Sequence, residues 1–275
     1  MIRRTHLIFV TLLLGCSAPT APPVAAETLP KGQYSTLQFT NKAGLVMQYD
    51  LYLPATYTAE AKLPLLVMMH GLGPPDPVKR KKGWGLPFLK MNAAYNEANH
   101  AAIICEPVAN AQWCRKCWDE TGWKTGSHTH DLAAPPAGIA MVLELIPVLL
   151  QQYGCDTNRV YVSGVSNGGY AAWDLLLYRP DLFAAAVPIC GAGDPPKAAR
   201  FAALPIWAFH GTADGTVPVA GTREMIAALE AAGGKPKATY FEDGKHAIWN
   251  QAWQTPGLLE WLFAQSRRPA KGSKP

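Results

Sequence analysis

The sequence has few charged residues, and its one N-terminal apolar run is too short to cross a bilayer. Only 16% of its 275 residues are charged and 49% are hydrophobic, so the chain is globular and can bury a substantial core in one large domain. The apolar run at residues 7–14 is shorter than the roughly 20 residues that a membrane-spanning helix needs. Internal repeats are absent as well, which excludes a repeat architecture.

The body of the chain also lacks an excess of positive charge, although the formal net charge is +5. Six of the 25 basic residues lie near the two ends: Arg3, Arg4, Arg267, Arg268, Lys271 and Lys274. The other 19 basic residues are balanced by 20 acidic ones. This balance gives no electrostatic reason to expect a nucleic-acid partner.

The N-terminus predicts export from a bacterial cytoplasm. Residues 1–15 combine two arginines with the short apolar run, as a signal peptide does. Residues 13–16, Leu-Leu-Gly-Cys, resemble a lipobox, in which Cys16 is acylated and becomes the first residue. Cleavage by ordinary signal peptidase near residues 25–26 is the alternative. Residues 16–31 are rich in Ala and Pro and are expected to form a flexible tether.

We therefore expect an outer-membrane lipoprotein that faces the periplasm or the cell surface, or otherwise a periplasmic or secreted protein. Ser17 after the cysteine favours the outer membrane, and the membrane is a partner only through the lipid anchor. The folded domain is expected at residues 32–266, followed by a basic disordered tail at 267–275.

The remaining five cysteines would then lie in an oxidising compartment, where some of them should pair. They are Cys105, Cys114, Cys117, Cys155 and Cys190. We expect a structural disulfide that involves Cys114 or Cys117, with Cys105 as one candidate partner. Cys190 follows the apolar run 184–189 and is expected to be a buried free thiol.

The order of elements predicts an α/β fold with a mostly parallel, doubly wound sheet. Two strands at residues 34–39 and 46–53 flank a turn and form an N-terminal antiparallel hairpin. Further strands are expected at residues 63–70, 101–105, 160–162, 184–190, 206–210 and 238–241. Helices are expected at residues 88–97, 137–153, 170–178, 219–232 and 258–265.

The most informative motif is Gly-Val-Ser-Asn-Gly at residues 164–168. G-x-S-x-G between a strand and a helix is typical of a nucleophile elbow, which holds a serine hydroxyl clear of the sheet. Glycines flank Ser166 because a Cβ there would collide with the neighbouring strand or helix. The motif predicts that Ser166 is a catalytic nucleophile.

A serine hydroxyl needs a base and an orienting acid, which follow in the order Ser, acid, His in this type of site. His246 lies in a loop after the last strand, and Asp214 follows the strand at 206–210. These positions favour Ser166, Asp214 and His246 as the triad. Asp194 is the rival acid, and His210 is expected to brace the acid loop.

Acyl transfer also requires donors for the negative charge that develops on the carbonyl oxygen. The backbone N–H groups of Asn167 and Leu72 are the expected oxyanion hole, with His70 in a structural role. No metal or cofactor is expected. His128 and His130 suggest a metal pair, but no third ligand is evident, so a loop at the edge of the cleft is favoured.

Residues 161–194, 206–214 and 244–249 together resemble bacterial α/β-hydrolases. The resemblance is to the group that includes predicted peptidases, polyhydroxybutyrate-depolymerase-like proteins, and feruloyl or acetylxylan esterases. It implies the α/β-hydrolase fold and ester rather than peptide hydrolysis. Two departures concern substrate choice: Asn167 stands where many relatives have Met, and the Cys114-Arg-Lys-Cys117 insert is unfamiliar.

The expected substrate is an acylated plant carbohydrate that carries acetyl or feruloyl esters. A polyester hydrolase acting on polyhydroxyalkanoates or aromatic diesters, and a small peptidase, are the alternatives. A surface carbohydrate-binding protein is the non-enzyme alternative. Trp123, in the tryptophan-rich segment 106–131, and Trp249 are candidate walls of the substrate site, although Trp249 could equally pack the core.

Overall fold

The computed structural model describes residues 29–72, 83, 85–108 and 131–267, and these residues form an α/β domain around one sheet. The eight strands lie in the order β1-β2-β4-β3-β5-β6-β7-β8. β1 and β2 are antiparallel and β2 is antiparallel to β4, whereas the six strands from β4 to β8 run parallel. The strands are β1 Gln33–Thr40, β2 Val46–Leu53, β3 Leu65–Met69, β4 Ile103–Val108, β5 Val160–Val165, β6 Ala185–Ile189, β7 Trp207–Gly211 and β8 Lys237–Phe241.

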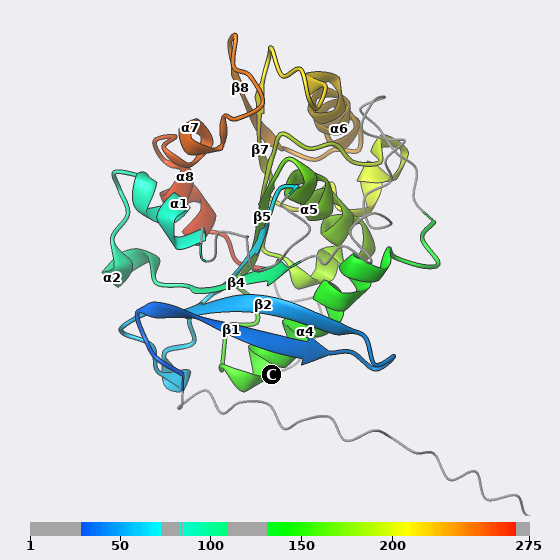
Figure 1. The fold of residues 1–275 in the computed structure, drawn as a ribbon. Helices are drawn as coiled ribbons and strands as arrows, with labels where there is room; N and C mark the ends of the chain where they lie inside the picture. The colour runs from blue at the N-terminus through cyan, green and yellow to red at the C-terminus, as the bar shows by residue number, and fades with distance from the viewer. Residues whose placement is uncertain (1–28, 73–82, 84, 109–130, 268–275) are drawn as a thin grey trace, which may run out of the picture.

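Helices cover both faces of this sheet (Figure 1). α1, α7 and α8 lie on one side of it, and α4, α5 and α6 lie on the other. Their bounds are α1 Gly85–Met91, α2 Glu97–His100, α4 Ala137–Gln152, α5 Asn167–Tyr178, α6 Val219–Ala231, α7 Trp249–Trp253 and α8 Leu258–Phe263. None of the helices in the described ranges has the length and apolarity that crossing a membrane requires.

The side chains of β3 pack into two apolar clusters, one on each face of the sheet. Leu65 and Val67 belong to the cluster that packs with α4 and α5, and Leu66 and Met68 belong to the cluster that packs with α1, α7 and α8. All four are at most 1% exposed. A central strand buried on both faces is apolar without interruption, which is why the run in the sequence predicted a parallel sheet.

The α/β-hydrolase fold and the N-terminal hairpin are confirmed, but the single helix predicted at 88–97 is only partly right, because α1 ends at Met91 and α2 begins at Glu97. Asn92 ends α1 because its side chain amide donates to the carbonyl of Trp253, 2.8 Å away, and its Oδ1 accepts from Ala94 N. A new helix, α2, then begins after Asn96. The side chain of Asn96 is the N-cap and accepts a hydrogen bond from Ala98 N at 2.9 Å.

The expected link from Cys105 to Cys114 or Cys117 is also wrong. Cys105 lies on β4 between β2 and β3, is 1% exposed and is a free thiol. Burial raises its pKa well above the ordinary value, so the thiol is neutral. Cys155 and Cys190 are free and buried as well, and for Cys190 this was predicted.

Several predicted features lie outside the described residues. They are the signal peptide with Cys16, almost all of the tether, nearly the whole tail, Cys114 and Cys117, and the segment 109–130 with Trp123, His128 and His130.

Candidate active site

Ser166 occupies a sharp turn between β5, which ends at Val165, and α5, which begins at Asn167. Its backbone has φ 55° and ψ −118°, a conformation that costs a non-glycine residue free energy and persists only where the surroundings enforce it. Its N–H donates to the carbonyl of Ile189 on β6 at 2.9 Å. The residue is 8% exposed, so the turn holds the hydroxyl just below the surface.

The two glycines of the motif are required by close backbone approach. A Cβ on Gly164 would lie 2.0 Å from the carbonyl oxygen of Gly168, and a Cβ on Gly168 would lie 1.9 Å from that of Met69. Neither position can therefore accept a side chain without moving the backbone. The absence of both side chains lets α5 pack directly on the ends of β3 and β5.

A chain of two hydrogen bonds joins Ser166, His246 and Asp214. His246 Nδ1 lies 2.7 Å from Asp214 Oδ2, and His246 Nε2 lies 2.8 Å from Ser166 Oγ. An ionised carboxylate only accepts, so Nδ1 carries the proton and Nε2 accepts from the serine hydroxyl when the ring is neutral. The predicted serine, acid and histidine are thus brought together, in the tautomer that can take a proton from Ser166.

The carboxylate of Asp214 is buried and fully hydrogen-bonded. Its side chain has no exposed surface, and Oδ1 accepts from the N–H groups of Thr216 at 2.8 Å and Val217 at 2.9 Å. Burial raises the pKa of Asp214, but the hydrogen bonds from His210, His246 and the two N–H groups outweigh it and hold that pKa below its usual range. Asp214 is therefore ionised.

Backbone contacts hold the acid loop against the histidine loop. Ala213 N donates to the carbonyl of Gly244 at 2.9 Å, and Thr212 N donates to that of Phe241 at 2.9 Å. A Cβ on Gly211 would lie 2.2 Å from the carbonyl oxygen of Gly244. The loops after β7 and β8 can therefore approach closely enough for Asp214 to reach His246.

His210 lies behind the acid and is completely buried. Its Nε2 is 3.0 Å from the carbonyl oxygen of Val217 and 3.3 Å from Asp214 Oδ2. Both partners are acceptors, so Nε2 carries a proton. Its Nδ1 is 2.7 Å from Thr222 Oγ1, and the same oxygen lies 2.8 Å from the carbonyl oxygen of Gly191. His210 braces the acid loop against α6, and Thr222 is a participant that the sequence analysis missed.

The rival acid, Asp194, lies elsewhere. It is the N-cap residue of a short 3-10 helix, Pro195–Arg200, and its carboxylate pairs with Lys197 Nζ at 2.7 Å. Nδ1 of His246 is engaged by Asp214. The geometry therefore favours Asp214 as the orienting acid.

The two predicted oxyanion donors lie on adjacent loops, because β3 and β5 are neighbours in the sheet. Asn167 opens α5, and its N–H is one of the first four of the helix, which have no acceptor within the helix. Leu72 follows Gly71, whose ideal Cβ position is 3.4 Å from Val165 O and 3.7 Å from Ser166 Cβ. The loop after β3 thus lies against the elbow, as an oxyanion hole requires.

The side chain of Asn167 is an unusual feature of this site. It is 0% exposed, and within the part of the chain that the structure describes neither its Nδ2 nor its Oδ1 has a hydrogen-bond partner. Burying an amide without partners costs about 1–3 kcal/mol, and Asn167 carries this cost directly beside Ser166.

Cys190, His210 and Asp214 form the one group of possible metal ligands within the described ranges, with ligand atoms within 4.8 Å of one another. Each already takes part in the hydrogen bonds that surround His246 and the Asp214 carboxylate. The Cys190 thiol donates to the carbonyl of His246, and burial followed by the charge of Asp214 raises its pKa. A neutral thiol is a poor metal ligand, so the group is better explained as packing behind the acid.

Trp249 lies beside His246 at the start of α7. Its ring meets that of His246 edge to face, with centroids 5.9 Å apart, and it is half-buried. It can therefore shape the rim of the site as well as pack against it.

A strand-to-helix elbow with a hydrogen-bonded serine, histidine and aspartate on this sheet is the arrangement of an α/β-hydrolase. The chain belongs to the family described as Putative esterase, which matches residues 40–268.

Two curated relatives are depolymerases. The chain is 29% identical over 212 residues to a poly(3-hydroxybutyrate) depolymerase of Ralstonia pickettii. The aligned region covers 71% of this chain and 40% of that protein. It is 23% identical over 189 residues to poly(3-hydroxyalkanoate) depolymerase C of Paucimonas lemoignei, covering 68% and 41%. The chain thus spans about two fifths of the length of these relatives.

Solved structures give the same fold. A thermostable esterase superposes with a TM-score of 0.72 at 30% identity, over 85% of this chain and 63% of the other. A ferulic acid esterase superposes with a TM-score of 0.62 over 84% of this chain and 98% of the other. At 17% identity, the second likeness concerns the fold alone. The predicted resemblance to α/β-hydrolase esterases is confirmed.

Proposed function

We propose that the protein is a serine carboxylesterase. The observation that carries this proposal is the hydrogen-bonded sequence from Ser166 Oγ through the His246 ring to a buried, ionised Asp214. Membership of an esterase family and the depolymerase relatives support ester rather than amide substrates.

The proposed reaction proceeds through an acyl-enzyme. Ser166 Oγ attacks the ester carbonyl carbon while its proton passes to His246 Nε2, and Asp214 stabilises the imidazolium that forms. The N–H groups of Leu72 and Asn167 bind the oxyanion. The tetrahedral intermediate collapses with cleavage of the carbon–oxygen ester bond, and the alcohol leaves with the proton from His246. Water then repeats these steps on the acyl-enzyme, which releases the acid and restores Ser166.

For the natural substrate we propose acetyl or feruloyl esters of plant carbohydrate, met outside the cytoplasm by an enzyme anchored through Cys16. Trp249 beside His246 supports this, because a rigid aromatic face can hold a sugar or aryl ring. Hydrolysis of polyesters is the second candidate, and what favours it is that both curated relatives are polyhydroxyalkanoate depolymerases.

The experiment is a hydrolysis screen with the wild type and Ser166→Ala. Nitrophenyl acetate measures general esterase activity. Acetylated xylan, feruloylated sugars and short polyhydroxyalkanoates distinguish the substrate classes. Ser166→Ala should lower turnover by about 10⁴-fold or more on every substrate, and Ser35→Ala, on the first strand, is the matched control that should retain it. Undiminished turnover in Ser166→Ala would refute the proposal. Binding of sugars without any hydrolysis would instead support the carbohydrate-binding alternative.

A further inference from the structure

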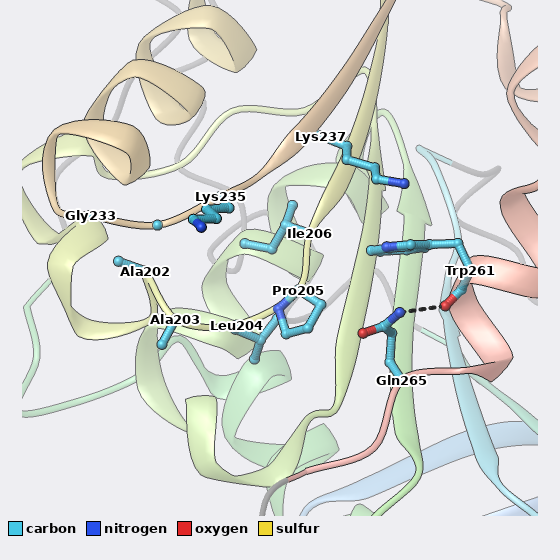
Figure 2. Close-up of a pocket in the computed structure, with 11 residues that line it drawn as sticks. Ala202, Ala203, Leu204, Pro205, Ile206, Gly233, Lys235, Lys237, Trp261 and Gln265 are labelled. Atoms are coloured by element: carbon cyan, nitrogen blue, oxygen red, sulfur yellow. Dashed lines mark hydrogen bonds between the residues drawn. The ribbon is translucent and has the colours of Figure 1, made fainter.

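The two edges of the sheet differ in how closely their loops pack. At the amino ends of β7 and β8, the chain leaves a hollow of about 380 Å³ that is bordered by Ile206, Lys237 and Trp261 (Figure 2). At the carboxyl ends of β6, β7 and β8, the loops instead meet at the side chain of Cys190, which is 0% exposed. This closely packed edge carries the hydrogen-bonded serine, aspartate and histidine, so a group at the meeting point of the loops can set their relative positions.

The turn that carries Cys190 is fixed by its backbone. Cys190 follows β6 directly, and its N–H donates to the carbonyl of Phe209 on β7 at 2.9 Å. Its φ of 49° lies in the left-handed region, which costs a non-glycine residue free energy and persists only where the surroundings enforce it. The next residue, Gly191, lies so close to α5 that a Cβ on it would be 2.4 Å from the carbonyl carbon of Gly169. The sulfur is therefore held at one place in the fold.

The sulfur of Cys190 contacts the loop that carries the histidine. Its Sγ lies 3.3 Å from the carbonyl oxygen of His246, which accepts from the thiol, and the N–H of Ile248 is a further hydrogen-bond partner of the sulfur. Both residues belong to the loop between β8, which ends at Phe241, and α7, which begins at Trp249. Because His246 lies outside any strand or helix, contacts from other elements have to hold its position.

The same sulfur contacts the loop that carries the acid. The N–H of Gly211, the last residue of β7, is a hydrogen-bond partner of the sulfur, and so is the side chain of Asp214. The Sγ lies within 4.8 Å of ligand atoms of both His210 and Asp214. Burial, followed by the charge of Asp214, raises the pKa of the thiol. The thiol therefore stays protonated and can donate to the carboxylate or to the carbonyl of His246.

The distances at the site make such a contact important for rate. The proton of Ser166 Oγ has to pass to His246 Nε2 across 2.8 Å, while Nδ1 stays 2.7 Å from Asp214 Oδ2. A displacement of about 1 Å in a reacting group can cost about a hundredfold in rate. A side chain that joins the acid loop to the histidine loop therefore limits the displacements that would slow the transfer.

We propose that Cys190 is a positioning residue for the ester hydrolysis: its thiol joins the loops after β7 and β8 and holds His246 within reach of both Asp214 and Ser166. Because Cys190 is completely buried, it acts through these residues and not on the substrate. The inference rests on the proposed esterase function, since it concerns the geometry of the same site.

Removal of the thiol also changes the hydrogen bonds to Asp214. Among the described residues, the titratable groups that face this carboxylate are His210, His246, Cys190 and Tyr170. Burial, followed by the charge of Asp214, raises the pKa of Tyr170 to about 12, so this group is neutral. A carboxylate that loses the thiol as a donor stabilises a protonated His246 more strongly. Activity on the acid side should then be lost at a higher pH.

The test compares Cys190→Ala with Cys155→Ala in steady-state hydrolysis of nitrophenyl acetate. Cys155 is the matched control, because its buried thiol also contacts a main-chain carbonyl, that of Leu149 at 3.6 Å, but it lies before β5, whose far end carries Ser166. Cys190→Ala should lower kcat about tenfold, keep KM within about twofold, and move the acid limb to higher pH. Cys155→Ala should keep the wild-type kcat and pH profile.

Cys190→Ser is the conservative variant, because a hydroxyl can donate to the same acceptors. It should restore kcat to within about threefold of the wild type. The proposal would be overturned by a kcat of Cys190→Ala within about twofold of the wild type, by an equal fall in Cys155→Ala, or by a fall with an unmoved acid limb and no recovery in Cys190→Ser. Undiminished turnover in Ser166→Ala would instead refute the esterase proposal, so the two failures are distinguishable.

Discussion

His210 and His246 contact the same oxygen atom of Asp214. Oδ2 lies 2.7 Å from His246 Nδ1 and 3.3 Å from His210 Nε2. His246 links this carboxylate to Ser166 by hydrogen bonds. His210 contacts the same carboxylate from the buried side and stabilises part of its negative charge. The strength with which Asp214 stabilises a protonated His246 therefore depends on His210, which touches neither the serine nor the substrate.

This arrangement predicts that His210 is a positioning residue with an effect on pH dependence. His210→Asn should lower kcat about tenfold and leave KM unchanged. The pKa of Asp214 is held low partly by His210, so it rises in the variant. A carboxylate freed of one donor also holds the His246 imidazolium more strongly. Both changes raise the pH at which the acid limb of activity is lost. The variant should therefore lose activity at a higher pH than the wild type.

The control for this measurement is Thr222, whose hydroxyl contacts His210 Nδ1. Thr222→Ser keeps the hydroxyl and should keep the wild-type pH profile, whereas Thr222→Val should move the profile in the direction of His210→Asn. A fall in kcat with an unmoved acid limb in His210→Asn would mean that the residue only supports the fold.

The choice between the two candidate acids predicts unequal effects of the same substitution. Asp214→Asn replaces an acceptor by an amide that can donate to His246 Nδ1, which favours the wrong tautomer, and turnover should fall about 10⁴-fold. Asp194→Asn weakens the pair with Lys197 and should change turnover by no more than about threefold. Steady-state kinetics on nitrophenyl acetate separate these outcomes, and the reverse ranking would move the acid to Asp194.

The close approach at the elbow predicts a stability difference between two glycines. Gly168→Ala places a methyl group 1.9 Å from the Met69 carbonyl oxygen, whereas a Cβ on Gly215 has nothing within 4 Å. The first substitution should lower the free energy of unfolding by about 3 kcal/mol and the second by less than about 0.5 kcal/mol. Denaturant unfolding measures both, and equal stabilities would show that the elbow tolerates a side chain.

The arrangement of the candidate site could be predicted because its signals are local. The glycines at 164 and 168 are needed within one turn, so the motif identifies Ser166 without knowledge of distant contacts. The carboxyl ends of parallel strands share one edge of a sheet, which is enough to bring Asp214 and His246 to that serine. The strands could be predicted from apolar runs because such runs are also local features of the sequence.

The features that could not be predicted depend on contacts between distant residues. The helix expected at 88–97 is interrupted because Asn92 binds the carbonyl of Trp253, 161 residues further along the chain. Cys105 was considered for a disulfide because an oxidising compartment was expected, and that expectation carries no information on the burial of its side chain within the sheet. Thr222 supports His210 from α6, and nothing in the sequence around it indicates this role.

Covalent labelling of Ser166 tests the central claim most directly. A fluorophosphonate reacts with a serine only where a base activates the hydroxyl and donors stabilise the developing negative charge. We predict that the folded protein takes up one probe per chain, that peptide mapping places it on Ser166, and that His246→Ala reacts at least about 100-fold more slowly. An unlabelled wild type, or equal labelling of Ser166→Ala, would contradict the account.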